Sequence, residues 1–196
     1  MTKTLAELVS SRICHDLINP IGAISNGLEL LSLSPDAPRE EIDLIDASVR
    51  NASARIRFFR IAYGSGQIGQ SCKATELSTI LSDISQFGKI SYAWDSEPIV
   101  DRQEAQTLFL FLQCLETNLP FGGSVVITYA NQTWTVTAEG ERVTDDLAFW
   151  EQIKNQQTVL AQASNQVQFA LLQQALKDQE RVFDFKAGYD KLTLTI

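Results

Sequence analysis

Apolar side chains in the first third of this 196-residue sequence recur with the period of a helix that packs against other helices. Their spacing alternates between four and three residues, which is typical of a heptad seam on a long helix. The first set is Ser10, Cys14, Leu17, Ile21, Ile24, Leu28 and Leu31, and the second is Ile42, Ile45, Val49, Ala52, Ile56 and Phe59. The spacing therefore predicts two long helices within residues 1–66.

The segment "SLSPDAP" separates the two apolar sets and contains two prolines, of which Pro38 suits the first turn of a second helix. Two helices joined by so short a segment form an antiparallel hairpin. A single hairpin leaves the flanks of both apolar stripes in water, and a second copy of the hairpin is the simplest cover. We therefore predict a homodimer whose hairpins form a four-helix bundle.

The composition indicates where the protein is located and which kinds of site and partner are not expected. The N-terminus has no apolar run of the signal-peptide type, and no stretch approaches the roughly 20 apolar residues that span a membrane, which predicts a cytoplasmic protein without a membrane partner. Cys14, Cys72 and Cys114 are odd in number and have no C-x-x-C spacing, so neither a disulfide framework nor a zinc site is expected. The net charge is −8, and the acidic excess lies after residue 66, which argues against a nucleic-acid surface.

His15 is the only histidine of the chain. It follows the seam residue Cys14, so it is rotated by about 100° from the seam onto the exposed flank of its helix. The residues that share this flank are mostly small or polar: Ser11, Ile18, Asn19, Gly22, Asn26 and Glu29. Such a face suits the close approach of another protein.

The neighbours of His15 favour a nucleophile. Asp16 can accept a hydrogen bond from one ring nitrogen, which fixes the tautomer and leaves the other nitrogen free to attack. Asn19 lies one turn further along the same face and can bind a phosphate or a water. Pro20 lacks an N–H and clashes with the carbonyl of Asp16, so the helix is expected to bend just after the histidine.

These residues resemble a known signalling family. "HDLINP" is similar to the phosphoacceptor box of the dimerisation and histidine-phosphotransfer domain of bacterial sensor histidine kinases. The longer stretch "CHDLINPIGAISNGLELL" resembles ChpT-type histidine phosphotransferases still more closely; these combine such a two-helix domain with a degenerate ATPase-like domain. The resemblance implies that His15 is phosphorylated, that Asp16 is its acid/base partner and that Asn19 assists.

A glycine-rich stretch, "GSGQIGQS", separates the hairpin from residues 70–196. Gly64, Gly66 and Gly69 match G-x-G-x-x-G, but they follow a helix instead of a strand and no P-loop lysine is present, so we interpret the stretch as an interdomain linker. The pattern then predicts helices at 75–87 and 104–118, strands at 89–95, 124–130 and 133–138, a polar helical stretch to 177, and a closing hairpin at 181–196. The fold class is α+β, with an α/β sandwich that has one sheet covered by helices on one face.

The order of these elements resembles the Bergerat-type ATPase domain of histidine kinases. Aligned on Gly122-Gly123, Cys114 occupies the position of the magnesium-binding asparagine, and Ala138 that of the adenine-recognising aspartate. Arg142 replaces a glycine, and the later glycine-rich box reads "NQVQFALLQQAL" without a glycine. Because cysteine is a poor ligand for a hard cation, we expect no ATP binding of the usual kind and no cofactor or metal of the chain's own.

Without ATP, His15 must receive its phosphoryl group from another protein. We therefore predict a histidine phosphotransferase that shuttles a phosphoryl group between receiver-domain aspartates of a hybrid sensor kinase and of response regulators. The receiver would supply the Mg²⁺, and it would dock on Ser11, Ile18, Gly22 and Asn26. Two alternatives remain open: a non-catalytic dimeric regulator that binds a sensor kinase, and a divergent ATP-dependent histidine kinase.

Overall fold

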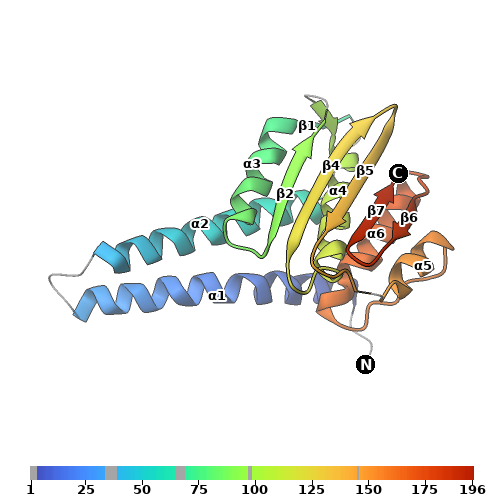
Figure 1. Cartoon of the computed structure of the whole chain (residues 1–196). Coiled ribbons are helices and arrows are strands. Elements are labelled where there is room, and N and C mark those ends of the chain that lie inside the picture. Colours follow the sequence, from blue (N-terminus) through green and yellow to red (C-terminus); the bar gives the residue numbers. More distant parts are fainter. Residues whose placement is uncertain (1–3, 34–38, 65–68, 97–98, 145) are drawn as a thin grey trace.

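The computed structural model describes residues 4–33, 39–64, 69–96, 99–144 and 146–196. A long helical hairpin projects from an α/β body, in which helices lie on one face of a sheet (Figure 1). The observed class is thus α+β with a mixed sheet. Pro38 and Gly66, which entered the expectations above, lie outside the described residues.

The hairpin consists of α1 (Leu5–Leu33) and α2 (Arg39–Ala62), which run antiparallel side by side (Figure 1). Both helices were predicted from the apolar spacing, and both are confirmed. They pack closely through small residues: a Cβ built on Gly27 would come within 2.5 Å of the Ile45 side chain. Pro20 and Ser48 are also buried. Small side chains here let the two backbones approach.

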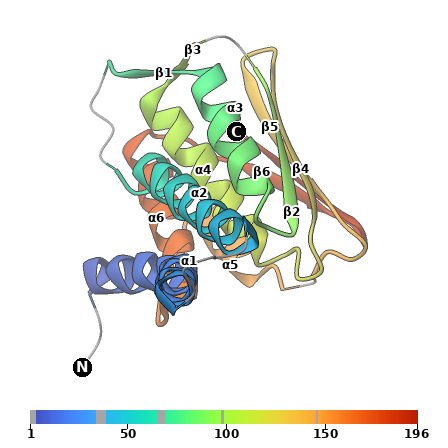
Figure 2. The same cartoon turned by 90° about the vertical axis from the view of Figure 1, so that its left-hand side faces the viewer.

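The axis of α1 changes direction inside the helix. In Figure 2, which looks along the hairpin, the first turns of α1 run across the view and the later turns are seen end-on. Pro20 is the proline inside α1. Since it cannot donate to the carbonyl of Asp16, it is the residue with a physical reason to cause the bend.

Each helix of the hairpin keeps exposed apolar residues, which together are called the exposed stripe. Its members recur every seven residues: Ile21 and Leu28 on α1, with Ile42, Val49 and Ile56 on α2, each 47% to 54% exposed. Only some residues of the predicted heptad seam therefore pack between α1 and α2. The rest faces outward and is available for another helical surface.

Five strands form the main sheet in the order β2-β4-β5-β7-β6. Their bounds are β2 Ile90–Asp95, β4 Gly123–Ala130, β5 Thr133–Glu139, β6 Asp184–Ala187 and β7 Lys191–Thr195. Only the β2–β4 pair is parallel among these neighbours, and the others are antiparallel. Gly122 precedes β4 with φ +90°, and a Cβ there would lie 2.3 Å from the Lys89 carbonyl oxygen, so the predicted Gly-Gly turn needs its glycine.

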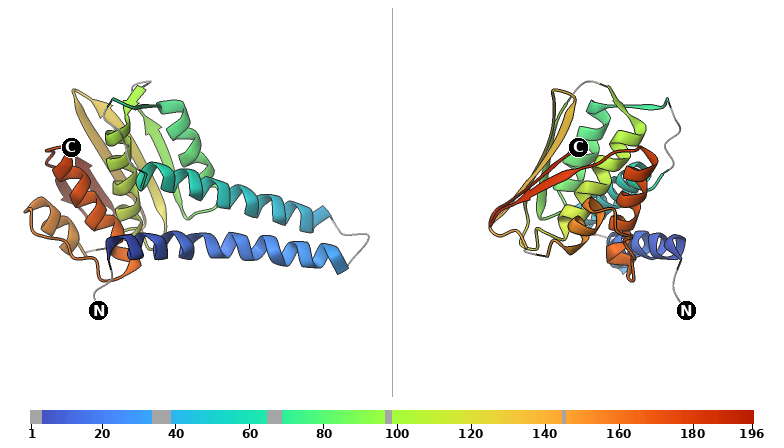
Figure 3. Two further views of the ribbon diagram at one scale, coloured as in Figure 1. Left: turned by 180° about the vertical axis from the view of Figure 1, so that it is seen from behind. Right: turned by 90° about the vertical axis from the view of Figure 1, so that its right-hand side faces the viewer.

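Three helices cover one face of the sheet: α3 (Ala74–Ser85), α4 (Arg102–Glu116) and α6 (Val167–Asp178) (Figure 3). Helix α4 is the central one, and its residues from Thr107 to Leu115 are all buried. The Asp101 side chain caps its start by accepting the Gln103 N–H at 2.8 Å. The continuous apolar run of this helix reflects burial on nearly all sides.

The structure differs from the sequence expectation in two places. Strands β1 (Ser71–Lys73) and β3 (Ile99–Asp101) form a small antiparallel sheet that was not predicted. The polar helical stretch is interrupted: α5 (Ala148–Lys154) and α6 are separated by an extended segment and a short 3-10 turn, Ser164–Gln166. Gln156 has φ +55°, which is incompatible with a continuing helix. The side-chain amide of the buried Gln173 then holds the extended segment, since it accepts the Val159 N–H and donates to the Gln157 carbonyl.

The hairpin is joined to the body by partly buried polar contacts. The Arg102 guanidinium donates to the carbonyl oxygens of Arg60, at 2.7 Å, and Gly64, at 3.3 Å. The Gln106 amide donates to the carbonyls of Ala62 and Gly64, both at 3.3 Å. These side chains of α4 satisfy carbonyls at the C-terminal end of α2 that have no helical donor, and so tie the hairpin to the body. No helix in the described part of the chain is long and apolar enough to cross a membrane.

Candidate functional site

His15 stands on the outside of α1 with its imidazole in water. Its side chain is 77% exposed. Nδ1 lies 2.9 Å from Oδ1 of Asp16, the neighbouring residue in the chain. When the ring is neutral, Nδ1 carries the proton donated to this carboxylate, and Nε2 keeps its lone pair. The geometry therefore presents Nε2 to solvent as a nucleophile.

Asp16 is itself held from the other side. Its Oδ2 accepts a hydrogen bond from Nε of Arg12, one turn earlier on α1, at 2.8 Å. The Asp16 and Arg12 side chains are only 10% and 15% exposed. The exposed imidazole thus rests on a carboxylate that is largely shielded from water and has both oxygens engaged.

A shallow groove of about 410 Å³ runs beside His15 between the two helices of the hairpin. Asn19 and Pro20 line it from α1, and Ser48, Asn51 and Arg55 from α2. The Arg55 Nε donates to the Asn51 Oδ1 at 2.9 Å, which fixes the guanidinium near the groove. A positive group and two amides next to the nucleophile provide donors suited to phosphoryl oxygens.

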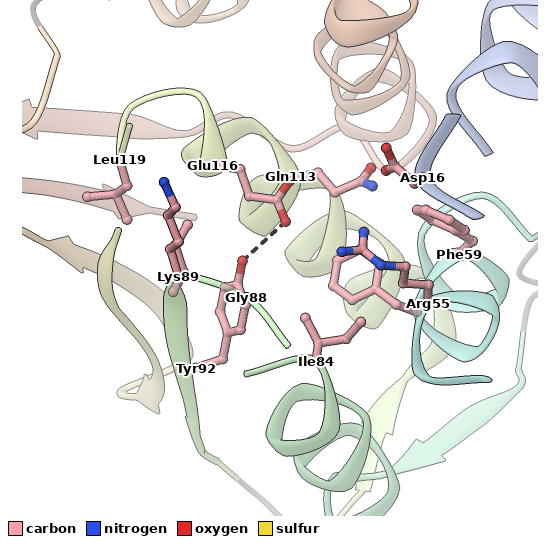
Figure 4. A pocket seen from close by; sticks show the side chains of 12 residues that line it. Asp16, Arg55, Phe59, Ile84, Gly88, Lys89, Tyr92, Gln113, Glu116 and Leu119 are labelled. Atoms are coloured by element: carbon pink, nitrogen blue, oxygen red, sulfur yellow. Dashed lines mark hydrogen bonds between the residues drawn. The ribbon is translucent and has the colours of Figure 1, made fainter. Parts of the chain in front are cut away.

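A deeper pocket of about 240 Å³ lies behind the carboxylate, between the hairpin and the body. Figure 4 shows Asp16 and Arg55 at the hairpin side of this pocket, and Tyr92, Gln113 and Glu116 at the body side. The Tyr92 hydroxyl donates to Glu116 Oε1 at 3.2 Å, drawn as a dashed line in Figure 4. The site around His15 is therefore continuous with polar groups of the second part of the chain.

The predicted flank of α1 lies on the surface. Ser11 and Asn26 are exposed, and Ile18 is 66% exposed, which is unusual for a large apolar side chain. Apart from its chain neighbours and the nearby backbone of its own helix, no atom lies within 4 Å of the position where a Cβ of Gly22 would be. The chain itself therefore gives no packing reason for glycine at residue 22, in contrast to Gly27.

Gly22→Ala provides a test of this flank. Alanine fits without a clash inside the chain and has the higher helix propensity, so we expect stabilisation by about 1 kcal/mol and a rise in Tm of about 2–4 °C. If a partner approaches closely at Gly22, association with that partner will weaken in the same variant. Thermal melting and partner binding are measured on one sample. A lower Tm would contradict the open space, and unchanged binding would remove Gly22 from the docking face.

Two of the positions compared with nucleotide-binding residues are buried, whereas Arg142 is exposed. Cys114 and Ala138 are both 0% exposed within the core. Burial raises the pKa of the Cys114 thiol well above its ordinary value, so the side chain stays protonated. The sequence "NQVQFALLQQAL" forms the 3-10 turn and most of α6. No cluster of three or more metal-ligating side chains occurs among the residues the structure describes.

Three residues that contact the site were not predicted from the sequence: Arg12, Tyr92 and Glu116. Arg12 had a usable signal, since a cation four residues before Asp16 on one helix face is a common ion pair. Glu116 is 104 residues from Arg12 in the chain, yet its Oε2 lies 3.4 Å from the Arg12 guanidinium. No local pattern indicates such a contact.

Comparison with known proteins adds three findings. A family model described as the histidine phosphotransferase C-terminal domain matches residues 74–191, more than half of the chain. Protein phosphotransferase ChpT of Brucella abortus (strain 2308) is 35% identical over 125 residues, which are 63% of this chain and 59% of that protein. A solved structure of a bacterial phosphotransferase is similar over 100% of this chain and 98% of its own, with a TM-score of 0.81 and 26% identity.

Proposed function

Because the chain belongs to the histidine phosphotransferase family, we propose that it relays a phosphoryl group between receiver-domain aspartates of a bacterial two-component phosphorelay. His15 is the residue that carries the phosphoryl group. The observation on which this rests is the exposed imidazole whose Nδ1 faces Asp16 at 2.9 Å. The alignment with the Brucella relative spans 59% of that protein, so the activity is proposed for this chain and not transferred from it.

The transfer step follows from the ring geometry. The Nε2 lone pair attacks the phosphorus of an aspartyl phosphate, a P–N bond forms, and the P–O bond to the receiver aspartate breaks with its electron pair leaving on the carboxylate. The ring gains positive charge as the bond forms, and the Asp16 carboxylate beside Nδ1–H stabilises that charge. The reverse step on a second receiver restores neutral His15.

Asn19 and the receiver complete the proposed site. Asn19, which lines the groove beside His15 one turn along the helix, would donate its amide N–H to a phosphoryl oxygen. The receiver supplies the Mg²⁺ that neutralises the other oxygens, so this chain needs only a nucleophile, its carboxylate partner and a docking surface. Donor receivers belong to a hybrid sensor kinase and acceptor receivers to response regulators in this scheme.

The proposed docking surface is the flank made by Ser11, Ile18, Gly22 and Asn26. Ile18 offers an exposed apolar contact three residues after His15. The open space at Gly22 allows a partner backbone to come close to the helix. An apolar centre with polar surroundings is typical of a transient protein interface.

The proposed functional unit is a homodimer. The support is the exposed stripe with seven-residue spacing on both helices of the hairpin, because a second hairpin is the partner that matches that period. Four helices would then share one core, and the two His15 side chains would stay on the outside of the bundle.

The second part of the chain is proposed to have no nucleotide chemistry. Titration calorimetry with ATP and Mg²⁺ is expected to show no binding up to millimolar nucleotide, because the buried neutral thiol of Cys114 offers no hard ligand. A saturable isotherm together with phosphate on His15 would favour the divergent kinase instead.

The direct test of the function is incubation of the protein with a panel of phosphorylated receiver domains. Transfer is expected to give acid-labile, base-stable phosphate on this chain, as phosphohistidine does. A protein that takes no label from any receiver of the panel would favour the non-catalytic regulator.

A further inference from the structure

A chain of polar contacts connects the nucleophile to the α/β body. It runs from His15 to Asp16 at 2.9 Å, from Asp16 to Arg12 at 2.8 Å, from Arg12 to Glu116 at 3.4 Å, and from Glu116 to Tyr92 at 3.2 Å. The first three residues belong to α1, whereas Glu116 ends α4 and Tyr92 lies on β2. Asp16 and Glu116 therefore each use one oxygen on the side of His15 and the other on the side of the body.

Asp16 and Arg12 are far less exposed than the imidazole, and the Glu116 side chain beyond them is 35% exposed. His15 is 77% exposed, but the side chains of Asp16 and Arg12 are 10% and 15% exposed. Ion pairs shielded from water are stronger and more directional than surface pairs. The two donors of the planar Arg12 guanidinium reach two carboxylates on different helices, a geometry that lysine cannot reproduce.

Arg12 favours the charged form of Glu116. Burial raises the pKa of Glu116, and the positive charge of Arg12 is the main effect that opposes the rise. Burial also raises the pKa of Tyr92 well above its ordinary value, with the Glu116 carboxylate adding to the shift, so Tyr92 stays a hydrogen-bond donor. The body thus offers Arg12 an acceptor, Glu116. Figure 4 shows the hydrogen bond from Tyr92 that holds this acceptor.

We propose that Arg12, anchored by Glu116, is a positioning residue that holds the Asp16 carboxylate against Nδ1 and so keeps the reactive tautomer of His15. The proposal rests on the proposed function for its effect on transfer, but not for its effect on the tautomer. The proposal also gives the α/β body a role, because Glu116 of the body supports the reactivity of a histidine in the hairpin.

The physical reason is the freedom of the Asp16 side chain. Without Arg12, Oδ2 loses its partner and only the bond from Nδ1 of the exposed imidazole still holds the carboxylate, so the side chain can turn toward solvent and away from the ring. The proton then distributes between Nδ1 and Nε2, so a smaller fraction of molecules presents an Nε2 lone pair. Loss of the outer partner that orients a metal-binding histidine typically costs about 10- to 100-fold in affinity or activity, and we expect a loss of that order for the nucleophilic ring of His15.

The test uses the full chain and two variants, Arg12→Ala and Glu116→Gln. His15 is the only histidine, so ¹⁵N signals of an imidazole in this protein belong to one ring. At a pH of about 8.5, well above the ordinary pKa of histidine, wild type is expected to show mainly the Nδ1–H tautomer. Both variants are expected to shift toward Nε2–H and to lose transfer rate, about 10- to 100-fold for Arg12→Ala and less for Glu116→Gln.

Lys191→Ala is the matched control. It removes the cation of an ion pair, Lys191 Nζ to Glu139 Oε1 at 2.7 Å, on the sheet. Its tautomer and transfer rate are expected to match wild type. Thermal melting reports whether each variant is folded, and Glu116→Gln, which keeps its shape, carries the test if Arg12→Ala unfolds.

A wild-type tautomer and a wild-type rate in either folded variant would overturn the proposal. Failure of the proposed function has a different signature, in which wild type itself takes no label from a receiver. The tautomer measurement still decides the role of Arg12 in that case.

Discussion

Replacing His15 with alanine is expected to abolish phosphoryl acceptance while leaving the protein folded. The side chain is 77% exposed and, among the residues that the structure describes, is shown bonded to the adjacent Asp16, so its removal is expected to change the free energy of unfolding by no more than about 0.5 kcal/mol. Chemically, the variant has no imidazole anywhere, because His15 is the only histidine. Labelling from a phosphorylated receiver and thermal melting are measured in parallel.

Two variants accompany this experiment. Asp16→Asn keeps the shape of the side chain but removes the charge that favours Nδ1–H, so transfer is expected to slow without vanishing. Glu29→Ala changes an acidic residue further along the same helix and is expected to transfer normally. A His15→Ala protein that still gained acid-labile phosphate would refute the assignment of the nucleophile.

The second large effect is expected at the exposed stripe of the hairpin. Ile21→Glu combined with Leu28→Glu would place carboxylates in the core of the proposed bundle. Each buried carboxylate costs several kcal/mol, and about 4 kcal/mol already raises a dissociation constant roughly a thousandfold. Because both side chains are about half exposed within one chain, the variant is expected to stay folded as a monomer.

Sedimentation and circular dichroism on the same samples separate the two effects. Glu29→Ala serves again as a control, and it is expected to remain dimeric. Ile24 is a poorer target, since it is partly buried within its own chain and its replacement would mix folding with association. A double variant that sedimented like wild type would show that the stripe is not the dimer interface.

Much of the fold was predictable from local patterns. Helices α1, α2, α3 and α4, and the strands β2, β4, β5 and the final hairpin, follow from apolar periodicity over many residues. Strands β1 and β3 have three residues each, too few to show a period. The break between α5 and α6 depends on Gln173, whose buried amide bonds a segment more than ten residues earlier in the chain.

The residues of the candidate site also fall into two groups, those predictable from local sequence and those that depend on tertiary contacts. His15, Asp16, Asn19 and Pro20 are neighbours in one turn of helix, so helical geometry alone places them together. The exposed positions of Ser11, Ile18 and Asn26 also follow from the angle between this flank and the seam. Which residues share one face of a helix follows from their spacing in the sequence alone.

By itself, the sequence determined the hairpin, its apolar stripe and the acid-flanked histidine, because each depends on residues within a few helical turns. Only the tertiary structure decided what supports that histidine: Glu116 reaches Arg12 across 104 residues of sequence. It also decided that Gly27 is glycine for packing against Ile45 whereas Gly22 is not. Both results depend on distances between separate elements, and chain folding sets those distances through the packing of the whole core.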